Sequence, residues 1–255
     1  MSVQPTLLMI ADIAGYTKFM KFHYMSLVHA QETVAKLLEA IIDAVPKLRL
    51  AKLEGDAAFF YLQGDADGRF DPSLVAAQAS AIYQAFHARA ADLRTNTLCP
   101  CDGCLQAGDL KIKLVGHVGT VALQKVKKLT ELAGVDVIVV HRMLKNDVPV
   151  AEYLLVTRPV YEMLDSPLRE RASNVTLELD DLGSTPAYYV DLRDCDDGLT
   201  TPKPLPMAAR LVRHAKESSS GSWAPNRPMR PAPGRSSNNC ADGWNMPGRS
   251  AREPS

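Results

Sequence analysis

The chain of 255 residues is long enough for one large domain, or for one domain with an extension. Hydrophobic residues make up 46% of it, which is ample for a buried core, and its 29 basic and 29 acidic residues cancel. This balance makes nucleic acid an unlikely partner. No run approaches the roughly 18 apolar residues of a membrane helix, and five cysteines are not typical of a secreted disulfide framework. We therefore expect a cytoplasmic protein without a membrane partner.

The first predicted element is a buried strand over residues 6–11 that ends at Asp12. Gly15 loosens the backbone after it. Apolar side chains at three- and four-residue steps then predict a long helix over residues 34–45, which Pro46 ends. The chain therefore begins with a strand that carries an acid at its end, followed by helical structure.

Residues 48–53 and 57–62 predict two strands of a hairpin, with Asp56 at its tip. The alanine-rich segment 74–93 predicts a second long helix. Apolar residues then alternate with lysines over 110–114, which indicates a half-buried strand running toward Gly116. We expect residues 118–126 to turn back as its partner. The later predicted elements are a helix over 135–144, a strand over 152–156, a helix near 159–164, and a strand pair at 175–179 and 187–192.

Strand pairs that alternate with helices indicate an α/β (α+β) fold, with an antiparallel-rich sheet and helices packed on one of its faces. We expect this domain to span residues 1–195. Beyond it, residues 196–255 form a basic tail in which Pro, Ser, Gly and Arg dominate. Such a composition buries too little apolar surface to offset the entropy of ordering, so we expect the tail to be disordered.

Asp12 and Asp56 form the most informative pair. If the first strand pairs beside the hairpin, both carboxylates emerge at the same end of the sheet, where a cation between them would relieve their repulsion. Oxygen ligands suit Mg²⁺, Mn²⁺ or Ca²⁺ rather than zinc. The backbone that follows, at Gly15, Tyr16 and Thr17, opens a helix whose N–H groups are placed to hold phosphate oxygens.

Four segments, in the same order along the chain, resemble motifs of the class III adenylyl and guanylyl cyclases. Residues 12–17 resemble their Asp-Ile-x-Gly-Phe-Thr segment, and residues 52–56 resemble their Lys-x-x-Gly-Asp hairpin. Residues 131–142 look like their Tyr-Asp-x-x-Gly-Asp-x-Val-Asn-x-Ala-x-Arg segment, and residues 177–190 are similar to their closing hairpin. The resemblance covers residues 6–192 and implies a divergent member with the ferredoxin-like class III cyclase fold.

The resemblance implies a role for each matching residue. Asp12 and Asp56 match the two metal-binding aspartates, and Ile13 matches the residue that lends a backbone carbonyl to the metal. Lys52 matches the lysine that reads adenine, and Glu131 lies where adenylyl cyclases carry their second adenine-reading residue. In the family these residues come from two chains, so the resemblance implies a homodimer.

The remaining matches concern catalysis. Arg142 matches the catalytic arginine that stabilises charge on the phosphate in the transition state. The family's asparagine four residues earlier is replaced by Ile138, which has no polar side-chain group to orient a ribose hydroxyl. The lysine of the closing hairpin is replaced by Asp180, which is electrostatically unfavourable beside a triphosphate. The leading interpretation is therefore metal-dependent binding of a purine nucleotide, ATP, with weak or no cyclase activity.

Two alternatives to this function stay open. One is an active adenylate cyclase that makes cyclic AMP and pyrophosphate from ATP, and the other is a protein-interaction module on the same fold. A separate possibility is a structural zinc ion held by Cys99, Cys101 and Cys104, with His117 or a partner chain as the fourth ligand. A loop of reduced cysteines is the competing interpretation of that segment.

Overall fold

The protein is described by a computed structural model that covers residues 2–22, 27–98, 106–127, 129–195 and 202–219. The strands are β1 (Ser2–Ala14), β2 (Arg49–Glu54), β3 (Ala57–Gln63), β4 (Lys111–Val126), β5 (Leu129–Ala133), β6 (Tyr153–Thr157), β7 (Ser173–Leu179) and β8 (Gly183–Asp191). The helices are α1 (Tyr16–Phe22), α2 (Leu27–Ala44), α3 (Leu74–Asn96), α5 (Val135–Arg142), α6 (Arg158–Tyr161), α7 (Ser166–Arg171) and α8 (Met207–Ser219). Short 3₁₀ turns, η2 (Ala107–Asp109) and η3 (Leu192–Cys195), join some of them.

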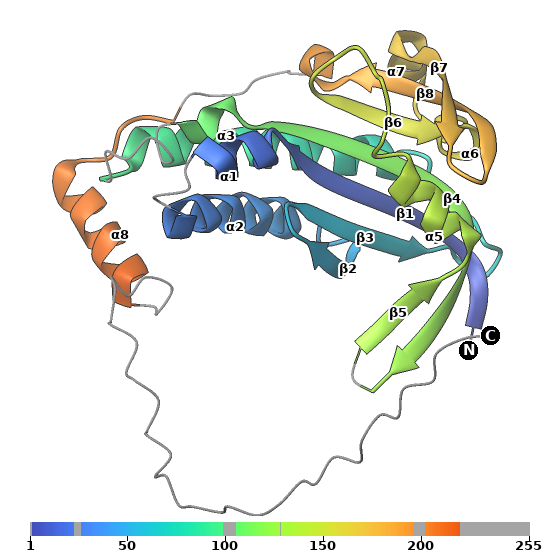
Figure 1. The fold of residues 1–255 in the computed structure, drawn as a ribbon, viewed down its shortest axis with the longest axis horizontal. Helices are drawn as coiled ribbons and strands as arrows, with labels where there is room; N and C mark the ends of the chain where they lie inside the picture. The colour runs from blue at the N-terminus through green and yellow to red at the C-terminus, as the bar shows by residue number, and fades with distance from the viewer. Residues whose placement is uncertain (1, 23–26, 99–105, 128, 196–201, 220–255) are drawn as a thin grey trace, which may run out of the picture.

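The strands form one sheet in the order β2-β3-β1-β4-β6-β8-β7, and β5 pairs with the far end of β4. Only β4 and β6 pair in parallel, so the predicted α/β fold with an antiparallel-rich sheet is confirmed. Figure 1 shows the long, central β1 and β4, with the β4–β5 hairpin extending away from the sheet.

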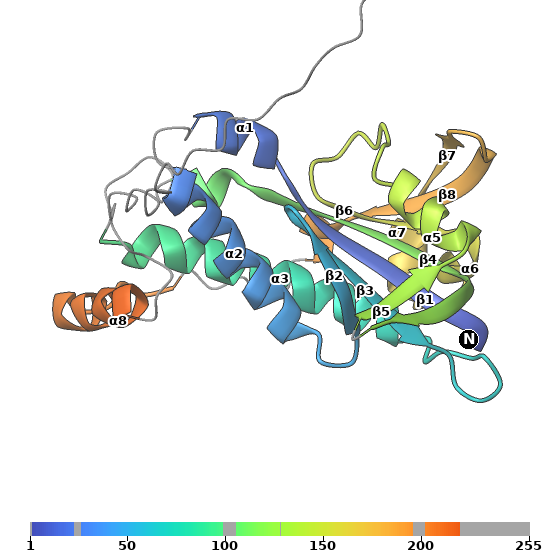
Figure 2. The same cartoon turned by 60° about the horizontal axis from the view of Figure 1, so that its bottom comes forward.

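Helices cover both faces of the sheet, whereas the sequence predicted helices on one. Figure 2 shows α2 and α3 running along one face, with α5 on the other side. Leu7 and Met9 of β1 face α2 and α3, while Leu8 and Ile10 pack in a second core with Val140 of α5. Because β1 is buried on both faces, its sequence is a continuous apolar run without strict alternation.

β4 is a single strand of 16 residues, which corrects the predicted turn near Gly116. The true hairpin joins β4 to β5. Both glycines of β4 allow close packing at this point. A Cβ atom on Gly116 would lie 3.3 Å from Val156 Cγ1, and one on Gly119 would lie 2.1 Å from Cγ of Asp136. Glycine inside a strand here reflects the approach of a neighbouring element and not a turn.

The basic tail also differs from its prediction, because Met207–Ser219 is the helix α8. The Arg213 guanidinium makes two contacts with the Asp92 carboxylate of α3, at 3.0 Å and 2.6 Å. Burial acts to raise the pKa of Asp92, but hydrogen bonds from Arg213 and Asn96 outweigh it and bring that pKa to about 2. A salt bridge between Arg213 and Asp92 therefore holds α8 against α3. The tail after residue 219 lies outside the described residues.

Among the residues that the structure describes, no helix is both long enough and apolar enough to cross a membrane.

Candidate functional site

Asp12 and Asp56 meet at one end of the sheet, as the sequence predicts. β1 pairs with β3 so that Asp12 lies opposite Ala57, the residue that follows Asp56. The N–H of Ile13 donates a hydrogen bond of 3.1 Å to the carbonyl of Asp56. This bond fixes the β2–β3 turn beside the end of β1, so the two acidic residues come from neighbouring strands.

Both carboxylates are electrostatically unfavourable as they stand. Burial, together with the negative charge of Asp56, raises the pKa of Asp12 from 3.8 to about 6, and the positive charge of Lys113 acts in the opposite direction. Burial also raises the pKa of Asp56. Raised pKa values in adjacent carboxyl groups indicate a site where negative charge lacks full compensation, which is what a bound cation would supply.

Lys113 is a member of this site that sequence reasoning missed. The register of β1 and β4 places it directly opposite Asp12, and β6 places Tyr153 opposite Lys113 in turn. The Lys113 ammonium lies 5.7 Å from the centroid of the Tyr153 ring. Lys113 alternates with apolar residues along its strand, and that pattern alone does not tell it apart from any solvent-facing lysine. Only the register of the sheet reveals it.

A second polar group lies on β2 and α5. The Lys52 ammonium contacts Oε1 of Glu54 at 2.6 Å, and Oε2 of Glu54 lies 2.9 Å from Nε2 of His141. Burial acts to raise the pKa of Glu54, but the hydrogen bonds and charges of Lys52 and His141 prevail and lower it. Lys52, predicted to read the base, therefore stands beside an ionised carboxylate.

Arg142, the predicted catalytic arginine, is the last residue of α5. Its Nη2 donates to Oδ2 of Asp181 at 3.1 Å, across to the β7–β8 turn. Its Nη1 is buried and has no hydrogen-bond partner among the residues that the structure describes. A buried donor without an acceptor is costly, so this guanidinium is suited to an additional acceptor such as a phosphate oxygen. Asp180, where the family carries a lysine, lies in the same turn.

A partly buried network of polar contacts connects the start of α5 to β4. Asp136 accepts from the N–H of Thr120 at 2.7 Å and contacts Nε2 of His117 at 2.9 Å. The other ring nitrogen of His117 lies 2.8 Å from the hydroxyl of Thr157. His117, considered above as a zinc ligand, is thus engaged by a carboxylate and a hydroxyl. The network fixes the position of the helix that carries Arg142.

The other predicted residues are placed as follows. Gly15 has a positive φ of 90°, and its carbonyl accepts from the N–H of Phe19, which starts α1. The Tyr16 hydroxyl accepts from Gln31, and Thr17 is exposed on α1. Glu131 is exposed on β5 opposite Gln124, and Ile138 is 48% exposed on α5. Cys99, Cys101 and Cys104 lie outside the described residues.

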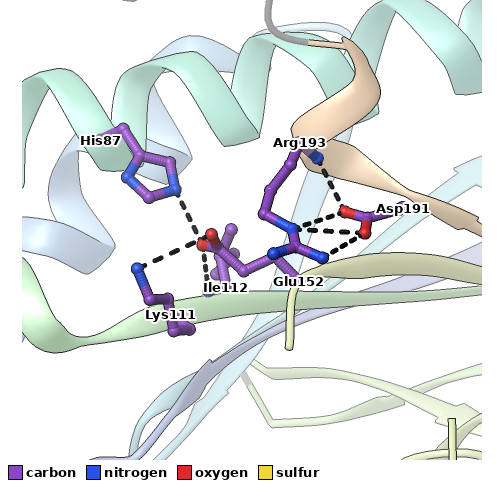
Figure 3. A network of polar contacts seen from close by, with 6 residues as sticks. All are labelled: His87, Lys111, Ile112, Glu152, Asp191 and Arg193. Atoms are coloured by element: carbon purple, nitrogen blue, oxygen red, sulfur yellow. Dashed lines mark hydrogen bonds and ion pairs between the residues drawn. The ribbon is translucent and has the colours of Figure 1, made fainter. Parts of the chain in front are cut away.

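On the face of the sheet that α3 covers, a buried carboxylate makes several polar contacts (Figure 3). Glu152, 2% exposed, accepts from the N–H of Ile112 at 3.2 Å and lies 2.7 Å from Nε2 of His87 on α3. Lys111 lies 3.9 Å from its second oxygen. These contacts satisfy the buried charge and tie α3 to β4 and β6, so we assign the network a structural role.

Within the described part of the chain, no three His, Cys, Asp or Glu side chains gather into a metal-binding group. Asp12 and Asp56 nevertheless fit a hard divalent cation, because Mg²⁺ is commonly held by one or two carboxylates together with water and substrate phosphates. The raised pKa values of both groups are the observation in favour of this fit.

Comparisons with known proteins place the chain in a family of related sequences. Residues 34–153 match the family model described as protein of unknown function DUF2652. The protein Rv2561/Rv2562 of Mycobacterium tuberculosis, described as uncharacterized, is 46% identical over 163 residues, which cover 64% of this chain and 75% of the relative.

Solved structures show the fold. The guanylyl cyclase Cya2 superposes with a TM-score of 0.57 at 13% identity, over 74% of this chain and 92% of that one. A class III adenylyl cyclase-like ATP-binding protein from Pseudomonas aeruginosa superposes with a TM-score of 0.53 at 16% identity, over 66% of this chain and 36% of that one. The described chain therefore has the fold of class III cyclases.

Proposed function

Because the chain belongs to the same protein family as Rv2561/Rv2562 and has the class III cyclase fold, we propose that it binds ATP together with a divalent cation. The observation that carries this proposal is the pair of partly buried carboxylates of Asp12 and Asp56, with Lys113 opposite Asp12. A bound cation would neutralise the carboxylates and attract the phosphates of the nucleotide.

The chain's own residues have distinct tasks in this proposal. Lys113, on the strand next to Asp12, is positioned to offset the charge of the triphosphate. Arg142 offers a buried Nη1 donor to a phosphate oxygen, and Lys52 donates to the base. The backbone carbonyl of Ile13 would contact the metal, and the backbone N–H groups of Gly15 and the first turn of α1 would contact the phosphates.

We further propose that the working form is a homodimer. The class III resemblance requires residues from two chains in each site, and β2 and α5 carry exposed apolar side chains beside their polar ones. Leu53 is 52% exposed, Val135 is 60% exposed and Ile138 is 48% exposed. Apolar residues on the elements that carry Lys52 and Arg142 favour an interface that closes over the nucleotide.

Cyclase turnover is low in this proposal. Ile138 has no hydrogen-bonding group where the family carries an asparagine, and loss of one transition-state donor typically costs about 10²–10³ in rate. The β7–β8 turn also presents acids, since Asp180 replaces a lysine and Asp181 contacts Arg142. Binding through the cation and Lys52 does not require the groups that are missing.

The test is to titrate the purified protein with ATP and Mn²⁺ by isothermal titration calorimetry, and to measure cyclic AMP in the same samples by mass spectrometry. We expect saturable, Mn²⁺-dependent binding, at least roughly tenfold weaker in Asp56→Asn, and little product. Glu170→Gln, an exposed acid on α7, is the matched control and should bind like the wild type.

The outcomes separate the candidate functions. Cyclic AMP that forms at an enzymatic rate and disappears in Asp56→Asn would establish an active adenylate cyclase instead. Absence of binding to any nucleoside triphosphate would leave the interaction module as the remaining interpretation.

A further inference from the structure

Glu54 stands beside the lysine that is proposed to read the base. Its Oε1 lies 2.6 Å from the Lys52 ammonium, and the two residues are two positions apart on β2. Side chains at this spacing emerge on the same side of a strand. A purine that reaches the Lys52 ammonium therefore also meets a carboxylate.

His141 fixes the orientation of this carboxylate. Its Nδ1 lies 2.7 Å from the carbonyl of Val137, which can only accept, and its Nε2 lies 2.9 Å from Oε2 of Glu54. The ring also packs edge-on against Phe59, with 4.9 Å between the ring centroids. Oε2 of Glu54 is therefore turned toward α5, and Oε1 toward Lys52.

We propose that Glu54 is the acidic base-reading residue of this site, accepting a hydrogen bond from the 6-amino group of adenine while Lys52 donates to ring nitrogen N1. The inference rests on the proposed function, since it requires that a purine nucleotide binds here. Adjacent donor and acceptor groups on the protein match the adjacent acceptor and donor on the edge of adenine. A carboxylate oxygen has lone pairs for more than one donor, so Oε1 serves both Lys52 and the base.

The geometry favours adenine over guanine. Guanine presents two neighbouring N–H donors to a carboxylate, and satisfying both requires that both oxygens turn toward the base. Oε2 of Glu54 instead faces His141, which leaves a single oxygen for the ligand. One acceptor beside one donor satisfies the N1 and 6-amino group of adenine, whereas guanine paired through O6 and N1–H would leave its 2-amino group without an acceptor on this carboxylate.

Glu54 takes the role that the class III resemblance gives to Glu131. Glu131 is exposed on β5, opposite Gln124 in the β4–β5 hairpin. The Lys52 ammonium instead contacts the carboxylate of Glu54, so Glu54 is the acid that is placed to share a ligand with Lys52.

The experiment compares ATP with purine riboside 5′-triphosphate, which lacks the 6-amino group, for binding to the full chain with Mn²⁺. A hydrogen bond to a charged acceptor contributes enough for roughly tenfold tighter binding of ATP to the wild type. Glu54→Met, similar in length but without an acceptor, should bring this ratio close to one. A change that only disturbs the structure would weaken both ligands equally and leave the ratio unchanged.

Further variants define the outcomes. Glu54→Gln keeps a carbonyl acceptor and should keep part of the preference, and Glu170→Met on α7 should keep all of it. A ratio that persists in Glu54→Met but collapses in Glu131→Met would overturn the assignment in favour of Glu131. A preference for GTP that is lost in Glu54→Met would overturn the adenine assignment. If the wild type binds both triphosphates equally, the inference fails alone, and if it binds neither, the proposed function fails with it.

Discussion

Replacement of Asp12 by asparagine tests the metal site through stability, independently of any enzymatic reaction. The pKa of Asp12 is about 6 instead of 3.8, because burial and the charge of Asp56 disfavour its ionised form. Between about pH 4 and pH 6 the folded protein therefore binds more protons at this group than the unfolded chain does. It follows that the stability of the metal-free protein decreases as the pH rises through this window, and stays lower above it.

The magnitude follows from the same pKa. The difference from the ordinary value corresponds to about 3 kcal/mol. Because Asp12 is only partly buried, screening by solvent reduces this to about 1–2 kcal/mol. Asparagine keeps the shape of the side chain without its charge. We therefore expect metal-free Asp12→Asn to be about 1–2 kcal/mol more stable than the wild type at pH 7.

Urea unfolding followed by circular dichroism at pH 5 and pH 7.5, with and without Mn²⁺, measures both effects. Mn²⁺ should stabilise the wild type at pH 7.5 and have little effect on Asp12→Asn, while Glu170→Gln should respond like the wild type. The reasoning would be refuted if metal-free Asp12→Asn were less stable than the wild type at pH 7.5. Equal stabilisation of both proteins by Mn²⁺ would also refute it, since the cation would then bind elsewhere.

Three further predictions concern the surroundings of the site. Gly119→Ala places a Cβ atom against Asp136 and should destabilise the protein by about 1–3 kcal/mol in urea unfolding. When Asp136→Ala is added, the double variant should recover part of that loss. If the effects of the two substitutions on the free energy of unfolding simply add, the steric explanation is wrong. The low pKa of Asp92 means that its contact with Arg213 stabilises the protein above about pH 4 and is lost as the pH falls toward 2. Proteolysis within α8 should therefore be faster in Asp92→Asn at pH 7. Unchanged cleavage would argue against the Arg213–Asp92 salt bridge as the contact that holds α8 in place. Ile138→Glu should convert the proposed dimer into a monomer in sedimentation velocity while the far-UV circular dichroism spectrum stays unchanged, and a dimer that persists would exclude α5 from the interface.

The fold was largely predictable because most elements carry a clear hydrophobic period. The apolar residues that recur every three or four positions along α2 indicate a helix, and the two short apolar segments of the β2–β3 hairpin indicate strands. β4 was mispredicted because Gly116 and Gly119 are typical of turns, whereas here each makes room for a neighbouring element. α8 was missed because composition predicts disorder from a lack of apolar residues, and its position depends on a charged contact with Asp92, far away in the sequence.

The site was predictable only in part, for a related reason. Asp12 lies near the end of a strand, three residues before Gly15, and Asp56 directly follows Gly55 in a turn, which is a local signal that the sequence displays directly. Lys113 and Glu54 have no such signal, since their roles depend on which residue lies opposite or beside them. Pairing across a sheet is a non-local property, and a single sequence shows period and composition but not register.

The proposed preference for binding over turnover has one electrostatic reason. The half with Asp12 keeps the residues that attract a cation and, through Lys113, a countercharge for phosphate. On α5, in contrast, the Nη2 group of Arg142 is already paired with Asp181, so a phosphate bound at Nη1 would compete with that carboxylate for the charge of the guanidinium. Such competition weakens an interaction that matters most when charge develops on the phosphate, and matters less for holding the ground state. A site altered in this way loses rate before it loses affinity, which is the behaviour that we propose for this chain.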